Sequence, residues 1–519
     1  MPIVFIGPAR WQRSALMTSI VHKLAECVTQ YSQAIAIETD DVSLSWAELG
    51  TLSFKMSARL RNAGVKKGDH VALFCGNRAA FLISWFAIAN RGAVTVCVNT
   101  GLVSEGFQYA ITQSKSSYLL VDDTLYPQVS EEISSLPPEV QLIRIEDDRH
   151  FFQDIQQEEE DDLCELHGSD PVTLIYTSGT TGRPKGVLNC HQAYIASGER
   201  MVDALRIRPE ERIMIVLPLF HANPQIYAVM SALLTGSTMV VRPKFSASRF
   251  FEDARQFKAT MFTYVGTILA MIAARFPEGD TDHNLDRCVG GGCSEATWLK
   301  LQDSFGIKPF ELYGMSETAG WASANSFQDY RIGSCGKVRD DLELVIVDKE
   351  DSILPAGESG EIALRPRLPF RLLMEYWDNP VASCGASRNF WFHTGDIGRF
   401  DEDGFLYFLG RDREIVRKGG ENISPIELEQ AMLEFPKIRD VAVVAVPDSI
   451  MGDEIKACIV AEEQFSATEL QEFLSRRIPK FMFPRYLQFL QQIPRTETEK
   501  IKRNLLQENH ANIIDAQKP

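Results

Sequence analysis

Residues 173–186 have the sequence TLIYTSGTTGRPKG, in which an apolar strand pattern leads into a loop of small and hydroxylated residues. Glycines let a backbone approach a ligand closely, hydroxyls add donors or reach a metal ion, and Lys185 adds a mobile positive charge. Gly182 and Lys185 are separated and no Ser or Thr follows the lysine, so the spacing is not that of a Walker loop. We therefore expect a polyphosphate-binding loop in a nucleotide-binding fold of another kind.

Short apolar strands alternate with amphipathic helices on both sides of this loop, which is typical of βα units and mostly parallel sheets. Ser45 and Glu48 form a capping-box pattern that predicts the start of a helix. The acidic run 158–162 is interpreted as a solvated loop with no function. The predicted N-terminal strands are 71–75, 93–98 and 118–121.

The pattern changes near residue 340 to a β-rich one, and a new βα pattern begins at Arg411. We expect strands at 342–348, 360–364, 404–410, 441–446 and 455–460, and helices at 425–434 and 467–477. The fold class is therefore α/β. A large domain of α/β sheets with a β-rich subdomain is expected over residues 1–410, and a small α+β domain over residues 411–519.

The composition excludes several classes of partner. The 519 residues carry 53 basic and 70 acidic side chains, and a net charge of −17 repels nucleic acid and anionic lipid. The ten cysteines show no metal-ligand spacing, which favours a reducing, cytoplasmic location. We expect no secretion signal in the opening residues. The apolar stretch 213–241 is interrupted by polar residues, so we expect buried core and no membrane insertion.

The segment 173–186 resembles the phosphate loop of the adenylate-forming (AMP-binding) superfamily, which includes acyl-CoA synthetases, carrier-loading adenylation enzymes and luciferases. Further segments are similar to family motifs and occur in the family's order, so the resemblance covers essentially the whole chain. They are GGG at 290–292, YGMSET at 313–318, WFHTGD at 391–396, GRDR at 410–413, RKGGENISP at 417–425 and PRTETEKIKR at 494–503.

The resemblance implies an ATP site. Asp396 would accept both ribose hydroxyls, with Arg411 beside it, and Tyr313 would stack on adenine. Thr318 would contact the α-phosphate, while Thr177 and Glu317 would ligate Mg²⁺. The full set of ATP-binding residues implied is Thr177, Ser178, Gly179, Thr180, Thr181, Gly182, Lys185, Gly291, Gly292, Tyr313, Gly314, Thr318, Asp396 and Arg411.

In the same resemblance the small domain is mobile and carries the catalytic Lys500, which would bridge the substrate carboxylate and the α-phosphate. Gly419, Gly420 and Glu421 would line the tunnel for the thiol arm of coenzyme A, and Arg413 would be the hinge. Two positions depart from the family pattern. The hinge is usually Asp or Lys, and Glu499 stands where glycine normally precedes the lysine.

His221 matches the family position that separates the acyl group from the thiol tunnel. The other residues expected to contact the acid are Asn223, Gln225, Tyr264, Gly290, Gly314, Met315, Ala319 and Trp321. Amides and large aromatic rings predict a polar or medium-sized acid. The pattern is similar to crotonobetaine/carnitine-type and related medium-chain acyl-CoA ligases, in which case Trp321 would contact a quaternary ammonium group through cation–π attraction.

The reaction implied is ATP-dependent activation of a carboxylic acid to acyl-AMP with release of pyrophosphate, followed by transfer to coenzyme A. Lys500, His221, Glu317 and Thr318 are the catalytic candidates. Two alternatives remain: an adenylation enzyme that loads the phosphopantetheine of a carrier protein, and a nucleotide-binding regulator without turnover, suggested by Glu499. The chain is expected to be a monomer or homodimer.

Overall fold

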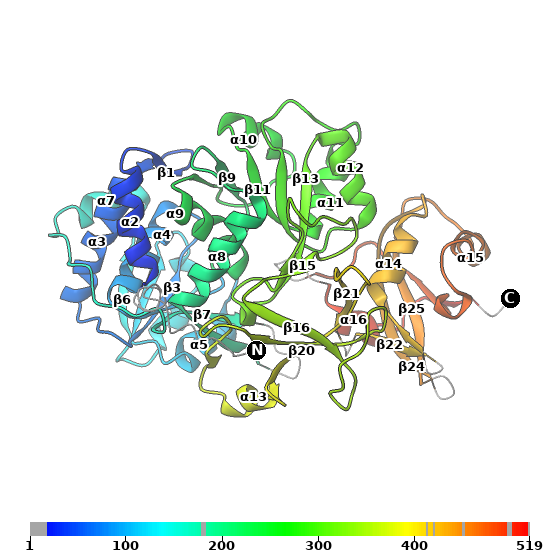
Figure 1. The fold of residues 1–519 in the computed structure, drawn as a ribbon. Coiled ribbons are helices and arrows are strands. Elements are labelled where there is room, and N and C mark those ends of the chain that lie inside the picture. The colour runs from blue at the N-terminus through cyan, green and yellow to red at the C-terminus, as the bar shows by residue number, and fades with distance from the viewer. Residues whose placement is uncertain are drawn as a thin grey trace, which may run out of the picture.

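Two large, mostly parallel sheets with helices around them form the N-terminal part of the chain (Figure 1). The structure is a computed structural model that describes residues 18–177, 183–411, 414–418, 421–448, 452–495 and 501–516. The predicted α/β class is confirmed.

The seven-stranded sheet has the order β18-β8-β7-β4-β3-β5-β6. Its strands are β3 (His70–Phe74), β4 (Val94–Cys97), β5 (Tyr118–Asp122), β6 (Gln141–Ile145), β7 (Pro171–Thr177), β8 (Lys185–Cys190) and β18 (Glu375–Tyr376). The strands from β7 to β6 are parallel neighbours, whereas β8 and β18 are antiparallel additions at one edge. The predicted strands at 71–75, 93–98 and 118–121 are confirmed as β3, β4 and β5.

The nine-stranded sheet has the order β15-β14-β13-β12-β11-β9-β10-β1-β2. Its strands are β1 (Ile35–Glu38), β2 (Ser43–Ser45), β9 (Arg212–Ile215), β10 (Thr238–Val241), β11 (Met261–Val265), β12 (Arg287–Gly291), β13 (Lys308–Tyr313), β14 (Ser323–Ala324) and β15 (Lys337–Val338). Because β11, β12 and β13 are parallel, their carboxyl ends meet at one edge, where ligands commonly bind in α/β sheets.

The helices of this part are α2 (Ile20–Tyr31), α3 (Trp46–Asn62), α4 (Ala79–Asn90), α5 (Ser104–Gln113), α6 (Ser130–Ser134), α7 (Asp148–Ile155), α8 (His191–Leu205), α9 (Ser231–Thr235), α10 (Phe250–Gln256), α11 (Gly266–Arg275) and α12 (Glu295–Phe305). The predicted capping box begins α3: Ser45 N donates to Glu48 Oε2 at 2.7 Å, and Glu48 N donates to Ser45 Oγ at 3.2 Å. Every residue of α4 is buried, as expected for a helix that is apolar on all sides and packed within the core.

The β-rich region predicted after residue 340 is confirmed. β16 (Leu342–Val347) and β17 (Gly360–Pro366) form the expected antiparallel hairpin, and β20 (Trp391–Phe400) pairs with β17, with β19 (Ser387–Arg388) and with β21 (Leu406–Arg411). The short helix α13 (Pro380–Gly385) precedes β19.

A third region follows β21 and lies beside it (Figure 1). It has the sheet order β23-β22-β25-β26-β27, with β24 paired to β25. Its elements are β22 (Val416–Lys418), β23 (Glu421–Ile423), α14 (Pro425–Leu433), β24 (Ile438–Asp448), β25 (Gly452–Ala461), α15 (Ala467–Leu474), β26 (Tyr486–Phe489), α16 (Arg503–Glu508) and β27 (Ile513–Asp515). The helices and strands predicted here from the sequence are confirmed.

The interpretation of the acidic run 158–162 as a solvated loop is wrong at one position. Asp161 is buried, with 8% of its surface exposed. Its carboxylate forms ion pairs with Arg61 and, at 2.9 Å, with Arg91, and accepts a hydrogen bond of 2.8 Å from the Ser57 hydroxyl. These partners lie in or next to α3 and α4, far away in sequence. Asp161 therefore binds the segment between α7 and β7 to the helices α3 and α4.

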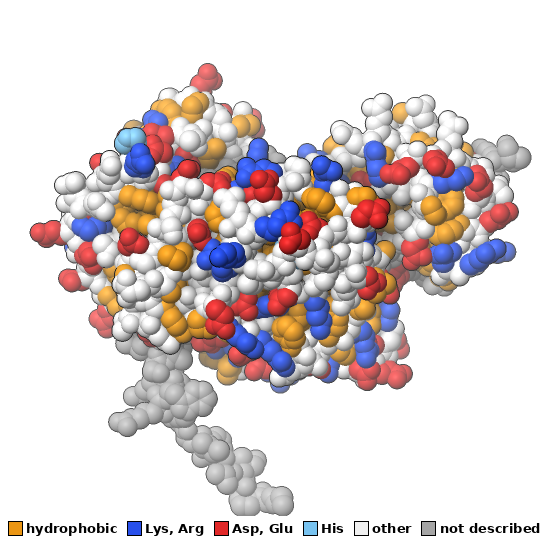
Figure 2. Space-filling model, turned by 90° about the horizontal axis from the view of Figure 1, so that it is seen from above, with side chains coloured by type: hydrophobic (Ala, Val, Ile, Leu, Met, Phe, Trp, Pro, Cys, Tyr) orange, Lys and Arg blue, Asp and Glu red, His pale blue; other side chains and the backbone are white. Residues whose placement is uncertain are grey.

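Acidic and basic side chains are interspersed over the face of the molecule seen in Figure 2. All ten cysteines are free; Cys384 is exposed, Cys164 is half-buried and the others are buried. Within the described ranges, no helix has the length and apolar character needed to cross a membrane. The opening residues, where no secretion signal was expected, lie outside the described part of the chain.

Candidate active site

The predicted phosphate loop connects two antiparallel strands. β7 ends at Thr177, β8 begins at Lys185, and these two residues are paired across the hairpin. Ser178, Gly179, Thr180, Thr181 and Gly182 lie outside the described residues. The two ends of the loop therefore bring a threonine and a lysine side by side.

Lys185 lies close to an aromatic ring that contacts a carboxylate. Its Nζ atom is 4.9 Å from the centre of the Tyr376 ring, and the Tyr376 hydroxyl donates a hydrogen bond of 2.9 Å to Glu317 Oε1. Tyr376 reaches this place because β18 pairs with β8. It connects the base of the loop to the YGMSET motif, and the sequence alone gave it no role.

Glu317 lies in the short 3₁₀-helix η3 (Ser316–Thr318), which follows β13, and only 5% of its surface is exposed. Burial raises the pKa of its carboxyl, while the charges of Arg411 and Lys185 act in the opposite direction. A buried carboxylate next to a phosphate loop fits Mg²⁺, which prefers oxygen ligands and commonly takes one or two carboxylates plus phosphates. Thr177, the other Mg²⁺ ligand expected from the sequence, lies at the end of β7, paired with Lys185.

Thr318 closes the turn that carries Glu317. Its hydroxyl donates to Met315 O at 2.9 Å and accepts from Met315 N at 3.1 Å. The chain then passes through two positive backbone angles, with φ of 49° at Ala319 and 97° at Gly320. The side chains of Glu317 and Thr318 are thus held in a single 3₁₀ turn that ends at Ala319.

Asp396 is the centre of a second buried group. The Tyr313 hydroxyl donates to its Oδ2 at 2.8 Å, and Arg411 Nε lies 3.5 Å from its Oδ1. Asp396 and Arg411 are paired between β20 and β21. Burial raises the pKa of Asp396 to about 6, against the opposing effect of the Arg411 charge. The Tyr313 ring stacks on Phe408 with centroids 5.6 Å apart.

These two groups act on each other electrostatically. The charges of Lys185 and Arg411 both lower the pKa of Glu317, and the charge of Glu317 raises that of Asp396. The structure therefore brings together the described parts of four motifs that lie between Lys185 and Arg411 in the sequence.

The glycine turn at 290–292 is held by a buried glutamate. Glu311 Oε2 accepts a hydrogen bond of 2.7 Å from the Tyr264 hydroxyl and one of 3.0 Å from Cys293 N, and Gly292 N donates to Oε1. Burial raises the pKa of Glu311 to about 7. Sequence reasoning missed this residue. The signal was a carboxylate between Phe310 and Leu312 in a buried strand, which requires partners.

Glycine is required at two motif positions by close backbone approach. A Cβ atom at Gly290 would lie 2.0 Å from Tyr264 O, and one at Gly314 would lie 2.1 Å from Gly320 O. Both distances are shorter than any tolerable contact. Gly291 sits at the end of β12 and Gly292 follows it with a φ of 91°.

The residues expected to contact the acid have different surroundings. Asn223 Nδ2 donates to Tyr264 O at 3.0 Å, and the His221 ring packs on Phe220 with centroids 4.4 Å apart. Gln225 is fully buried in the π-helix η2 (Pro224–Met230), where its amide has protein partners: it accepts from Tyr194 and donates to Leu219. Met315 is half-buried and Ala319 is buried.

Trp321 is buried and already has a cation against it. Its indole Nε1 donates to Ser197 O at 3.1 Å, and the guanidinium carbon of Arg339 lies 5.2 Å from the ring centre. Arg339 and Arg371 both form ion pairs with the fully buried Asp341, at 2.8 and 2.9 Å, and Arg200 approaches the same carboxylate at 3.2 Å. Three guanidiniums thus surround one carboxylate behind Trp321.

Two family models match most of the chain. The model of the AMP-binding enzyme family matches residues 24–377, and that of the AMP-binding enzyme C-terminal domain matches residues 427–500. This chain belongs to the AMP-binding enzyme family. It is an adenylate-forming ligase of the AMP-forming acid–thiol type, whose co-substrates are ATP, with Mg²⁺, and coenzyme A.

Relatives of this adenylate-forming ligase include two crotonobetaine/carnitine–CoA ligases. The one from Salmonella agona (strain SL483) is 32% identical over 479 residues, which are 89% of this chain and 92% of the relative. The one from Shigella dysenteriae serotype 1 (strain Sd197) is 32% identical over 459 residues, which are 85% and 89% of the two chains.

Solved structures resemble the ligase over nearly its whole length. The anthranilate CoA ligase AuaEII in complex with anthranoyl-AMP has a TM-score of 0.88 at 26% identity, covering 95% of this chain and 97% of that one. The o-succinylbenzoate CoA synthetase MenE from Bacillus subtilis, in complex with its acyl-adenylate OSB-AMP, has a TM-score of 0.81 at 28% identity, with coverage of 94% and 98%.

Several expected residues of the ligase lie outside the described part. These are Arg413, Gly419, Gly420 and Lys500, and of Glu421 only the backbone, in β23, is described. The two ends of the lysine segment are fixed, because Arg495 and Ile501 form an antiparallel bridge and Arg495 pairs with Asp440 at 2.8 Å. The roles given to these residues stay predictions.

Proposed function

We propose that the buried carboxylates of Glu317 and Asp396 and the half-buried cations Lys185 and Arg411 bind ATP, and that the acid is adenylated beside them. The supporting observation is the mutual electrostatic effect of these side chains at the end of the phosphate-loop hairpin. Asp396 would accept hydrogen bonds from the ribose hydroxyls, and Lys185 would offset charge on the phosphates.

Adenylation makes a carboxylate reactive. A carboxylate repels nucleophiles and has no good leaving group, so the acid oxygen first attacks the α-phosphorus of ATP and pyrophosphate leaves. A thiol then attacks the carbonyl carbon of the mixed anhydride and AMP leaves. In both steps charge develops on oxygens, and fixed cations near those oxygens are the main source of acceleration. Mg²⁺ held by Glu317 and Thr177 would supply further positive charge when bound.

Lys500 is the residue we propose to bridge the acid and the α-phosphate. In the Lys500→Ala variant, pyrophosphate exchange should fall by about 10²-fold or more, whereas a synthetic acyl-adenylate should still be converted by coenzyme A. Lys502→Ala is the matched control, because Lys502 is an exposed lysine in the same segment. Normal exchange in Lys500→Ala would contradict this role, and with it the mechanism proposed here.

We propose that the small domain begins at Arg411 and turns about Arg413 between the two steps. Both Lys500 and the tunnel residues Gly419 to Glu421 belong to this domain, yet they serve different steps at the same acyl carbon. A rotation brings each to the site in turn.

The acyl group is proposed to be polar or medium-sized and to carry no quaternary ammonium. The Trp321 ring already has the Arg339 guanidinium over it, and that guanidinium belongs to the three-arginine group around Asp341. A second cation at this ring would be repelled. This differs from the substrates in the names of the crotonobetaine/carnitine relatives and replaces the cation–π contact expected from the sequence.

The test is AMP release against a panel of acids of similar length. Polar or medium-sized acids without a quaternary ammonium group should be turned over, while crotonobetaine and carnitine should give less than about a tenth of that rate. A preference for either trimethylammonium acid would contradict this proposal and leave the adenylation chemistry untouched.

Coenzyme A is the acceptor, and loading of a carrier protein is a second candidate only through the shared pantetheine arm. Thioester formation with free coenzyme A and with a phosphopantetheinylated carrier separates the two.

A cytoplasmic location is proposed because all ten cysteines are free thiols, which a reducing compartment preserves. A monomer or homodimer remains our expectation for the assembly, and light scattering checks it.

A further inference from the structure

The loop that carries His221 contains a hydrogen-bonded turn. His221 N donates to Pro218 O at 3.1 Å, which places Leu219 and Phe220 at the two central positions of a β-turn. In such a turn the direction of the central peptide, between Leu219 and Phe220, distinguishes one turn type from another. Whatever holds the Leu219 carbonyl therefore fixes the direction in which His221 leaves the turn.

Two amide side chains hold the Leu219 backbone, one on each side. Leu219 N donates to Asn77 Oδ1 at 2.7 Å, and Gln225 Nε2 donates to Leu219 O at 2.7 Å. Asn77 Nδ2 also donates to Leu217 O at 2.8 Å and to Arg242 O at 3.1 Å. The amide nitrogen and the amide oxygen of Asn77 thus both bind backbone groups, which lie in the segments that follow β9 and β10.

The two amides are themselves held from different parts of the fold. The Tyr194 hydroxyl donates to Gln225 Oε1 at 2.7 Å, and Gln225 Nε2 also approaches Cys97 Sγ, at the end of β4, at 3.3 Å. Their positions therefore depend on packing between the two large sheets, since Asn77 follows β3 and the loop follows β9.

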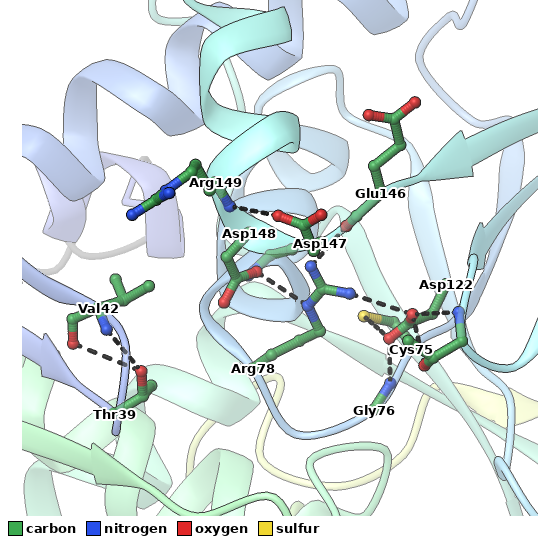
Figure 3. A network of polar contacts seen from close by, with 12 residues as sticks. Thr39, Val42, Cys75, Gly76, Arg78, Asp122, Glu146, Asp147, Asp148 and Arg149 are labelled. Atoms are coloured by element: carbon green, nitrogen blue, oxygen red, sulfur yellow. Dashed lines mark hydrogen bonds and ion pairs between the residues drawn. The ribbon is translucent and has the colours of Figure 1, made fainter.

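The two chain neighbours of Asn77, Gly76 and Arg78, belong to the polar network drawn in Figure 3. Gly76 N donates to Asp122 Oδ2 at 3.4 Å, and Arg78 forms ion pairs with Asp122 at 3.0 Å and Asp148 at 2.9 Å. The residues on both sides of Asn77 are therefore anchored to the ends of β5 and α7.

We propose that Asn77 and Gln225 are positioning residues that orient His221 by holding the Leu219 peptide. The inference rests on the proposed acyl transfer and on the role that the family resemblance implies for His221, at the boundary between acyl group and thiol tunnel. Gln225 acts here through the backbone and not by contact with the acid. Loss of the Gln225 amide frees the central peptide, and loss of the Asn77 amide frees the Pro218–Leu219 peptide before it. In either case His221 leaves its place between the acyl group and the thiol tunnel, and acyl-adenylate is lost to water before the thiol attacks.

The first test measures the loop itself. In Asn77→Leu, hydrogen exchange of the peptide spanning residues 217–221 should rise, because the acceptor of the Leu219 N–H is gone. Asn90→Leu is the matched control: Asn90 is buried and also makes three hydrogen bonds, to Ser57, Asp162 and Cys164, away from this loop. Equal exchange of 217–221 in the two variants would overturn the proposal.

The second test measures coupling to His221 with a double-mutant cycle. Asn77→Leu and Gln225→Leu should each lower the thioester formed per AMP released about three- to tenfold, the range for one lost hydrogen bond, while Asn90→Leu leaves this ratio unchanged. In a His221→Ala background, Asn77→Leu and Gln225→Leu should have no further effect. A full effect in that background would overturn the proposal. A normal ratio in His221→Ala alone would instead contradict the role assigned to His221. Hydrogen exchange of residues 217–221 would then still test whether Asn77 holds the Leu219 backbone.

Discussion

At the scale of single residues, the site is marked by carboxylates whose pKa is raised by burial. Glu311, Glu317 and Asp396 are each removed from water and lie near hydrogen-bond donors or cations of distant motifs. A buried carboxylate is costly unless it is paired, and such shifted groups gather where ligands bind. The raised pKa values of Glu311 and Asp396, about 7 and about 6, make the protonation of these two carboxyls depend on pH near neutrality.

Asp396 gives a prediction for nucleotide binding. Its pKa is raised to about 6, and ribose hydroxyls need an ionised acceptor, so the affinity for adenosine should fall as the pH drops below that value, by about tenfold per pH unit at the acid limit. Adenosine is the suitable ligand because it has no phosphate to titrate. Calorimetry between pH 5 and 8 measures the effect.

In Tyr313→Phe the same curve should move to higher pH. The lost hydroxyl stabilises the ionised form of Asp396, while the stacking ring is retained. An unchanged midpoint in this variant would show that another group controls the titration.

Glu311 gives a prediction for stability. Its pKa is about 7 in the folded protein, well above the usual value for glutamate, so the folded state binds the proton more tightly than the unfolded state. The free energy of unfolding should therefore decrease as the pH rises from about 5 to about 7, by up to about 3 kcal/mol. Denaturant unfolding at several pH values should show this decrease in the wild type and lose it in Glu311→Gln. A parallel decrease in both would assign it to other groups.

At the scale of elements, the carboxyl ends of β11, β12 and β13 form one edge whose backbone is crowded. Tyr264 and Gly290 are paired neighbours in β11 and β12, and Gly314 follows β13 directly. The chain after β13 returns at once through Gly320 and Trp321 to β14. The tight return is what places Glu317 and Thr318 beside the hairpin of β7 and β8.

Gly314→Ala should disrupt that return. The added methyl group would lie 2.1 Å from Gly320 O and 2.3 Å from Trp321 Cα, so we expect a loss of about 3 kcal/mol or more in unfolding free energy. Gly385→Ala in α13 is the control, because a Cβ atom there meets nothing within 4 Å and should change stability by less than about 1 kcal/mol. Urea unfolding compares the two, and similar stability would contradict the crowding argument.

At the scale of the whole molecule, the region after β21 is connected internally next to the proposed hinge. Arg503, in α16, forms ion pairs with Glu414 at 3.2 Å and with Glu429 of α14, and donates to Val443 O at 2.6 Å. Glu414 lies just after Arg413, whereas α16 follows the Lys500 segment. The two ends of the small domain are therefore joined and should move together.

Arg413→Pro should separate the two half-reactions. Proline fixes φ near −65° and removes the N–H, so rotation at the hinge is restricted. We expect pyrophosphate exchange close to that of the wild type and thioester formation reduced by about 10²-fold. Arg413→Ala, which removes only the side chain, should retain both activities. Equal loss of both in Arg413→Pro would argue against the hinge.

The motifs could be identified from the sequence because each combines certain residue types at a spacing that has a direct chemical reason. Thr177 and Lys185 at the ends of the hairpin, Glu317 in its buried turn, and the pair of Asp396 with Arg411 all lie in motifs identified in the sequence. The capping box of α3 and the buried strands could be predicted likewise, because they depend on neighbours in the chain.

The sequence by itself determined the fold class, the family and the order of the motifs, because local periodicity and short spacing encode them. Only the tertiary structure decided that Gln225 binds a backbone carbonyl, that Asp161 is buried between two helices, and that Glu311 and Tyr376 connect motifs. Each of these depends on partners distant in the chain. Burial and hydrogen bonding are set by packing between sheets, which no local pattern records.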